Sequence, residues 1–166
     1  MNSLGSSSRG RVGGATLAAL AALTLAIALA LASTSTAQAS GSCPGVLIAQ
    51  QPVEWGLGSL DVYYDGATGR NCARVVSSSS TWGVRKHMQV VLLSCSSTSP
   101  SQPCGSYRRV QDQGSFRYYA GPVSVSARGR CILAYGKITT STSHGNAQLG
   151  RWASRTTTPL SGVHCG

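Results

Sequence analysis

Few residues of this 166-residue chain are suited to acid–base chemistry. The candidates are three histidines, His87, His144 and His164, and four acids, Glu54, Asp61, Asp65 and Asp112. Serines are abundant, but no Gly-x-Ser-x-Gly segment presents one of them as a hydrolase nucleophile. A glycosidase needs two carboxylates that face each other across a cleft, and most of these acids lie in or near predicted turns. The acidic residues and serines therefore identify no class of hydrolase.

A small secreted nuclease is the enzyme to which these residues come nearest. Its chemistry needs a general base, a histidine acid and cationic groups that hold phosphate. Glu54 could act as the base and Arg85 as the phosphate clamp. His87 or His144 could act as the acid, but nothing in the spacing brings these residues together. We therefore expect no catalytic residues, no metal and no cofactor, and keep a nuclease as an alternative.

Trp82, Arg85 and Lys86 are the candidate ligand contacts. Trp82 follows a polar loop, where an exposed ring could stack on a polysaccharide, although large aromatic side chains commonly fill a small β core. Fourteen Lys and Arg residues against four Asp and Glu residues give a formal charge of +10, which favours anionic partners. The basic residues form scattered pairs without interleaved aromatics. We therefore expect anionic cell-wall or spore-surface polymers as partners, and no specific nucleic acid.

The cysteines predict a disulfide framework. An even number of cysteines in an exported domain is typical of such a framework, and the absence of a Cys-x-x-Cys segment argues against zinc. Cys95 and Cys104 bound a short polar loop and are expected to pair, a bond that contributes about 2.7 kcal/mol in the chain-entropy model. These considerations leave the pairing of the remaining four open: Cys43, Cys72, Cys131 and Cys165.

Residues 1–39 are predicted to be a secretory signal peptide. Arg9 and Arg11 precede an uncharged Ala/Leu-rich stretch over residues 15–32, and Ala37-Gln38-Ala39 is typical of a cleavage site. A transmembrane anchor is the alternative, but alanine is only weakly hydrophobic. Cleavage leaves residues 40–166 as one secreted domain with a charge of +8 and no further membrane contact.

Short segments rich in Val, Tyr, Thr and Ser, separated by turn signals, predict an all-β protein. We expect a compact, disulfide-stapled antiparallel sandwich or barrel of about seven or eight strands. The expected strands cover residues 46–50, 59–64, 71–77, 84–94, 106–110, 123–127, 131–138 and 148–157. Turns are expected at residues 65–70 and 111–114, and a polar loop at 139–146. The unbroken apolar run 90–93 is typical of a strand that is covered on both faces. Pro122, which lacks an N–H donor, indicates a bend or a sheet edge.

Several short segments occur in the same order as in a known family. They are residues 62–64 (VYY), 68–72 (TGRNC), 119–123 (YAGPV), 129–131 (GRC) and 163–166 (VHCG). In these segments the chain resembles the spore-associated protein A family of small exported actinomycete proteins. The resemblance implies an extracellular location at the spore or hyphal surface and brings no catalytic residues. Compared with the family, this chain has an insertion, the Cys95–Cys104 loop. For the other four cysteines the resemblance leads us to expect the bonds Cys43–Cys165 and Cys72–Cys131.

Three functions follow, in order of preference. The first is a secreted, non-catalytic protein that associates with the spore or cell surface. The second is a protease inhibitor that uses the Cys95–Cys104 loop as a rigid reactive loop, because preorganisation favours tight binding. That loop carries no large or basic residue at its tip. The third is the nuclease.

Overall fold

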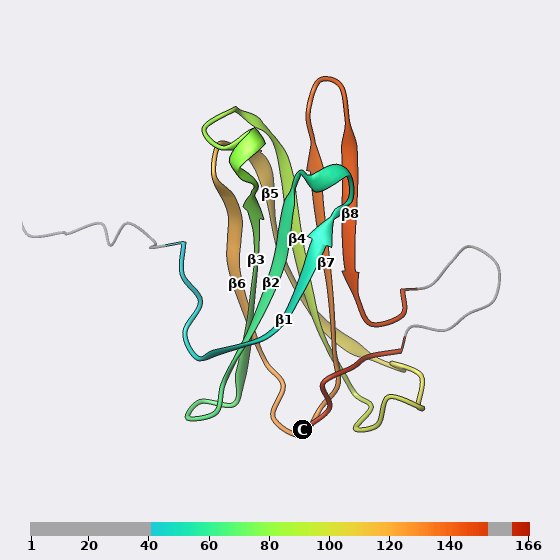
Figure 1. Cartoon of the computed structure of the whole chain (residues 1–166). Coiled ribbons are helices and arrows are strands. Elements are labelled where there is room, and N and C mark those ends of the chain that lie inside the picture. The colour runs from blue at the N-terminus through green and yellow to red at the C-terminus, as the bar shows by residue number, and fades with distance from the viewer. Residues whose placement is uncertain (1–40, 153–160) are drawn as a thin grey trace, which may run out of the picture. The chain divides into compact units, whose positions relative to one another are not determined.

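The computed structural model describes residues 41–152 and 161–166, which form two antiparallel sheets packed face to face (Figure 1). The predicted signal peptide and residues 153–157 of the last predicted strand lie outside the described residues. The strands are β1 (Val46–Val53), β2 (Gly58–Asp65), β3 (Arg70–Ser77), β4 (Lys86–Cys95), β5 (Tyr107–Phe116), β6 (Tyr119–Ser126), β7 (Ile132–Thr139) and β8 (His144–Leu149). Short 3-10 turns, η1 (Glu54–Gly56) and η2 (Ser79–Thr81), follow β1 and β3. No helix in the described part of the chain is long and apolar enough to cross a bilayer.

The strand order identifies an open sandwich rather than a closed barrel. One sheet has the order β1-β2-β3-β6 and the other the order β5-β4-β7-β8. Strands β5 and β6 are edge strands of different sheets, and the tight β5–β6 connection joins them. The edge position of β6 agrees with the expectation from Pro122, because an edge strand does not need every backbone donor.

Strand β4 is buried on both faces, as its continuous apolar run predicts. Val90 and Leu92 point between the two sheets into the main core, whereas Val91 and Leu93 point to the opposite face. There they belong to a second cluster with Cys95, Cys104, Cys131 and Leu133, against which Trp152 and Cys165 pack. The indole Nε1 of Trp152 donates a hydrogen bond to the carbonyl of Ala134 at 3.0 Å, which anchors this cover to β7.

The two sheets lie in close contact at Gly136 on β7. A Cβ atom at this position would lie 2.6 Å from Cγ2 of Val75 on β3 and 3.3 Å from Cβ of Leu60 on β2. Both neighbours are fully buried. The absence of a side chain at position 136 therefore sets the distance between the sheets at the centre of the sandwich.

Two polar segments were predicted wrongly. Residues 111–114, expected to form a turn, lie inside β5, and the expected loop 139–146 contains the first half of β8. Both β5 and β8 are edge strands with one paired side, and β5 is largely exposed. Because an exposed edge strand buries few side chains, its sequence need not alternate between apolar and polar residues, and the composition resembles that of a loop.

Three disulfides join consecutive cysteines along the chain. The bonds are Cys43–Cys72, Cys95–Cys104 and Cys131–Cys165. The short Cys95–Cys104 loop is closed as its spacing predicts. The pairing expected from the family resemblance, Cys43–Cys165 and Cys72–Cys131, is wrong. Cys72 faces outward from the β1-β2-β3-β6 sheet, where the N-terminal segment crosses it, whereas Cys131 lies in the cluster on the far side of the other sheet.

Replacement of Gly136 by alanine should destabilise the protein. The added methyl group has no space between Val75 and Leu60, so we expect a loss of about 1–3 kcal/mol in the free energy of unfolding, measured by urea denaturation. The matched control is Gly66→Ala, whose added Cβ atom has its nearest neighbour in the Tyr64 ring at 3.8 Å. Equal unfolding midpoints for the two variants would contradict the close approach of the sheets.

Tryptic mapping of the unreduced protein should find disulfides between cysteines that are consecutive along the chain. Cleavage after Arg70, Arg74, Arg130 and Lys137 puts Cys72 in peptide 71–74 and Cys131 in peptide 131–137. We expect peptide 71–74 to be linked to the peptide that carries Cys43, and peptide 131–137 to the C-terminal peptide. A mass corresponding to peptides 71–74 and 131–137 joined to each other would contradict the structure.

Candidate functional site

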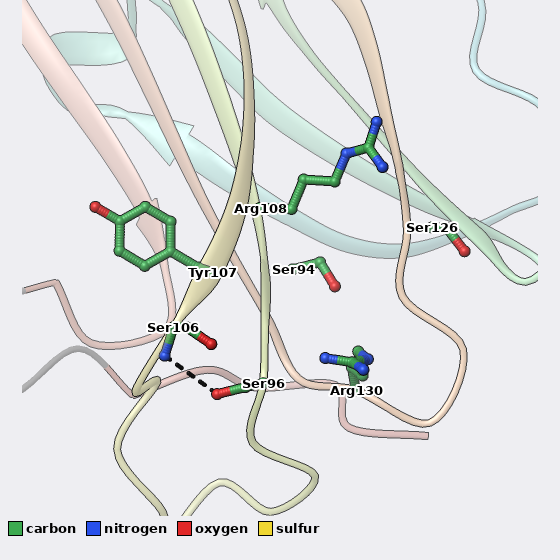
Figure 2. A pocket seen from close by; sticks show the side chains of 7 residues that line it. All are labelled: Ser94, Ser96, Ser106, Tyr107, Arg108, Ser126 and Arg130. Carbon is green, nitrogen blue, oxygen red and sulfur yellow. Dashed lines mark hydrogen bonds between the residues drawn. The ribbon is translucent and has the colours of Figure 1, made fainter.

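A polar pocket of about 320 Å³ opens at the end of the sandwich where β4 runs into the Cys95–Cys104 loop (Figure 2). Strands β4 and β5 and the residues beside them form one wall, and the end of β6 with the β6–β7 turn forms the other. The lining residues are Ser94, Ser96, Ser106, Tyr107, Arg108, Ser126 and Arg130. This open-end pocket combines hydroxyl groups with two guanidinium groups, and its lining contains no carboxylate and no imidazole.

A second surface lies at the opposite end of β4, where aromatic rings and arginines meet. Trp82 is 54% exposed and Tyr118 is 43% exposed, and their ring centroids are 5.0 Å apart with an interplanar angle of 51°. Arg85 and Arg117 each donate a hydrogen bond to a backbone carbonyl nearby, at 3.1 and 2.7 Å. These four residues form the aromatic–arginine platform, and a shallow pocket of about 310 Å³ adjoins it at Arg117 and Tyr118. The exposure of Trp82 and Arg85 suits the ligand contact predicted from the sequence.

Lys86, the third predicted ligand contact, is a structural residue. Its side chain is 4% exposed and points between the sheets. The ammonium group donates hydrogen bonds to the carbonyls of Thr81, Val84 and Arg117 at 2.7, 2.8 and 2.9 Å. Burial lowers the pKa of the Lys86 ammonium, and the three carbonyls supply the acceptors that such a buried charge needs. The sequence could not reveal this, because Arg117 is distant along the chain.

Strand register brings two of the histidines into one row. His87 on β4 and His144 on β8 both pair with Thr139 on β7, so the three side chains share a face of the sheet. Both histidines are exposed, and the buried Oγ1 of Thr139 has no hydrogen-bond partner among the described residues. His164 lies apart, exposed in the C-terminal segment. The row depends on pairing across three strands, which sequence spacing alone does not show.

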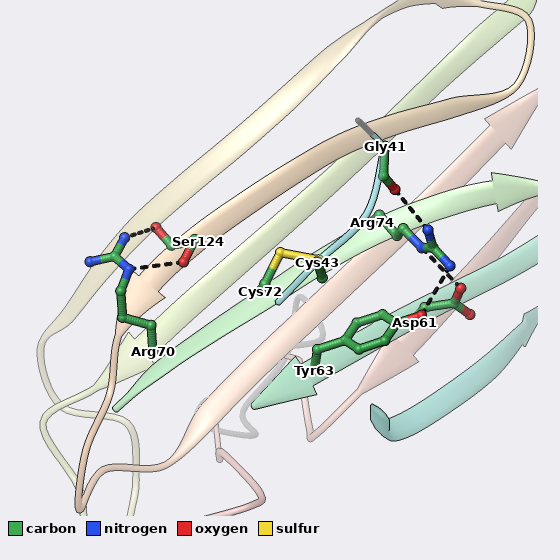
Figure 3. Close-up of a disulfide and its surroundings, with 8 residues drawn as sticks. All are labelled: Gly41, Cys43, Asp61, Tyr63, Arg70, Cys72, Arg74 and Ser124. Atoms are coloured by element: carbon green, nitrogen blue, oxygen red, sulfur yellow. Dashed lines mark hydrogen bonds and ion pairs between the residues drawn. A yellow bond between two sulfur atoms is a disulfide. The ribbon is translucent and has the colours of Figure 1, made fainter. Parts of the chain in front are cut away.

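Asp61 is the most enclosed carboxylate and forms an ion pair with Arg74 (Figure 3). It is 4% exposed and accepts hydrogen bonds from Gln50 and Ser59, both at 2.8 Å, in addition to the 3.3 Å contact with Arg74. Arg74 also donates to the carbonyl of Gly41 at 2.7 Å and to the Tyr63 hydroxyl at 2.9 Å. This network fastens the N-terminal segment to the sheet beside the Cys43–Cys72 bond.

The other three carboxylates also hold parts of the fold. Asp65 caps the β2–β3 turn, where the hydrogen bond from the Thr68 hydroxyl, at 2.6 Å, lowers the pKa of the Asp65 carboxyl. Asp112 accepts the backbone N–H of Gly121 at 2.8 Å. Glu54, the proposed nuclease base, accepts the backbone N–H of Asn146 at 3.2 Å. Every carboxylate side chain of the described residues therefore has a structural hydrogen bond.

The tip of the Cys95–Cys104 loop, the candidate reactive loop of an inhibitor, is folded into a turn. The backbone N–H of Gln102 donates to the carbonyl of Ser99 at 3.1 Å, and the carbonyl of Pro100 accepts a hydrogen bond from the Ser161 hydroxyl. The loop is thus tied to the C-terminal segment as well as closed by its disulfide. The inhibitor function stays a prediction.

Comparison with known proteins finds one similarity that agrees with the resemblance seen in the sequence. Over 97 residues the chain is 33% identical to spore-associated protein A of Streptomyces coelicolor (strain ATCC BAA-471 / A3(2) / M145). The match covers 58% of this chain and 52% of the relative, so the chain spans about half the length of the curated relative that it matches. No family model matches the chain, and no solved structure matches it. The similarity supports a relationship to that protein over the matched part.

Replacement of Lys86 by methionine should lower stability without changing the surface. Methionine retains most of the side-chain volume but leaves one buried and two partly buried carbonyls without this donor, so we expect a loss of about 2 kcal/mol in the free energy of unfolding. The control is His87→Ala at the next, exposed position, which should change this free energy by less than about 0.5 kcal/mol. A variant K86M as stable as the parent would contradict a structural role for Lys86.

Proposed function

We propose that this protein is a secreted, non-catalytic protein that adheres to the spore or cell surface through anionic envelope polymers. The observation that carries the proposal is the difference between the carboxylates, which take part in hydrogen bonds of the fold, and the arginines, most of which are exposed. The four carboxylates are tied into the fold by hydrogen bonds, and the ion pair between Asp61 and Arg74 is the only one among the described residues. Eight arginines are exposed: Arg70, Arg85, Arg108, Arg109, Arg117, Arg128, Arg130 and Arg151.

Such a surface attracts polyanions over a broad area. Because Lys and Arg outnumber Asp and Glu, the carboxylates neutralise only part of this charge, and the positive field extends into solvent. The aromatic–arginine platform adds exposed rings, on which the faces of sugar rings can stack. The three disulfides suit a protein that works outside the cell, where oxidising conditions preserve them. The similarity to a spore-associated protein supports the spore or cell surface as the location.

Co-sedimentation tests the proposal. The purified, oxidised protein, residues 40–166, should pellet with isolated spore walls or vegetative cell walls at about 50 mM salt. Most of it should be released at about 500 mM salt, because salt screens the attraction between exposed charges. The amount in the pellet is measured at each salt concentration on equal masses of the two wall types.

A variant W82A separates general charge attraction from contact through the platform. If the platform binds sugars, this variant should lose the fraction that remains on the wall at high salt while its low-salt pelleting stays close to that of the parent. The variant R85Q/R117Q should instead shift the salt dependence. Protein that stays in the supernatant with both wall types at low salt would refute the proposed function.

A further inference from the structure

The inner face of β4 begins and ends with a polar residue, Lys86 at one end and Ser94 at the other. Lys86, Met88, Val90, Leu92 and Ser94 all point between the sheets. At the first end the ammonium of Lys86 has its three carbonyl acceptors. At the other end Ser94 is 5% exposed and lines the open-end pocket. A polar group that is this enclosed needs a hydrogen-bond partner, and a solvent molecule or a ligand in the pocket can provide one.

The hydroxyl of Ser94 faces the open-end pocket, between two arginines (Figure 2). Arg108 on β5 is the register partner of Ser94, so the two side chains share a face. Arg130 reaches the pocket from the β6–β7 turn. In the described part of the chain neither guanidinium forms a hydrogen bond or an ion pair, in contrast to Arg74, Arg85 and Arg117.

Disulfides fix the backbone on both sides of this pocket. Ser94 and Ser96 flank Cys95, which is bonded to Cys104, and Arg130 precedes Cys131, which is bonded to Cys165. The two parts are joined because Cys95 N–H donates to the Cys131 carbonyl at 2.8 Å and Cys131 N–H to the Ser97 carbonyl at 2.9 Å. The backbone that carries the donors is thus held in place before a ligand arrives, which lowers the entropy cost of binding.

We infer that the open-end pocket binds one phosphate group of a polyol phosphate or sugar phosphate. A tetrahedral phosphate directs its oxygens to different sides, so it can accept hydrogen bonds from arginines on opposite walls and from Ser94 between them. A planar carboxylate has two oxygens in one plane and matches a single guanidinium fork. The pocket volume of about 320 Å³ exceeds that of a phosphate group alone, and the half-exposed ring of Tyr107 borders the remaining space.

The pocket binds its ligand and does not hydrolyse it. Its lining offers no carboxylate or imidazole to activate a water molecule or to protonate a leaving group. This inference deepens the proposed function, on which it rests for the source of the phosphate: a phosphodiester polymer of the envelope would present many such groups in series. Each bound phosphate would then hold the protein on the surface by a defined contact in addition to the general attraction.

Chemical-shift titration of the ¹⁵N-labelled protein with glycerol 3-phosphate tests this site. We expect saturable shifts of the backbone amides at Ser94, Ser96 and Ser106, and no such shifts with glycerol or acetate. The variant R108Q should weaken binding at least tenfold. Its matched control is R109Q, which removes the same charge from the next residue of β5, on the opposite face and outside the pocket, and should change the affinity less than twofold.

Two results would overturn the inference. One is the absence of saturable shifts around the pocket; the other is an equal loss of affinity in R108Q and R109Q, which would indicate diffuse attraction. A third variant, R130Q, tests the opposite wall and should weaken binding as R108Q does. All three variants exchange exposed side chains, and the unchanged amide shifts of β2 and β7 would verify that each one folds.

Wall binding separates this inference from the proposed function. If R108Q binds glycerol phosphate poorly but pellets with walls as the parent does, the phosphate site stands and its use on the envelope is refuted. If the parent binds glycerol phosphate in the pocket but pellets with no wall, the surface function fails while the site stands. If R108Q loses both glycerol phosphate binding and pelleting with walls, the site and its use on the envelope are both supported. Walls from which hydrofluoric acid has removed the phosphodiesters should then retain R108Q and the parent equally.

Discussion

The burial of β4 and β7 on both faces is the constraint on which the rest of this structure depends. A two-sheet sandwich covers one face of each sheet, and the apolar side chains on the outer face of β4 need a second cover. The chain provides it with Trp152, the C-terminal segment and two disulfides packed against Val91, Leu93 and Leu133. The same bonds adjoin the walls of the open-end pocket, so the cover that completes the core also shapes that pocket.

The distribution of charge links this architecture to the function proposed for it. The few acids of this chain take part in the fold: Asp61 is buried on β2, Asp65 holds the β2–β3 turn and Asp112 links β5 to β6. The arginines outnumber these acids, and eight of them are exposed. The surface of the protein is therefore basic, as its composition indicates.

The sequence predicted features that depend on neighbouring residues. It did not predict features that depend on contacts between segments distant in the chain. The turn at Asp65, the alternation of Ala73 and Val75 into the core, and the doubly covered strand at residues 90–93 follow from short-range patterns. The second half of β5 was predicted as a turn because an exposed edge strand has no apolar alternation to detect. The role of Lys86, the row of histidines beside Thr139 and the pocket at Ser94 depend on strand register and on the β6–β7 turn, which sequence spacing does not determine.

The order of the disulfides has a consequence for biogenesis. Each cysteine is bonded to the next one along the chain, and no bond encloses or crosses another. A chain that emerges into an oxidising compartment from its N-terminal end would therefore reach the native connectivity by joining each pair as soon as its second member appears. Consecutive pairing thus lowers the number of wrongly paired forms that such a chain has to pass through on its way to the native bonds.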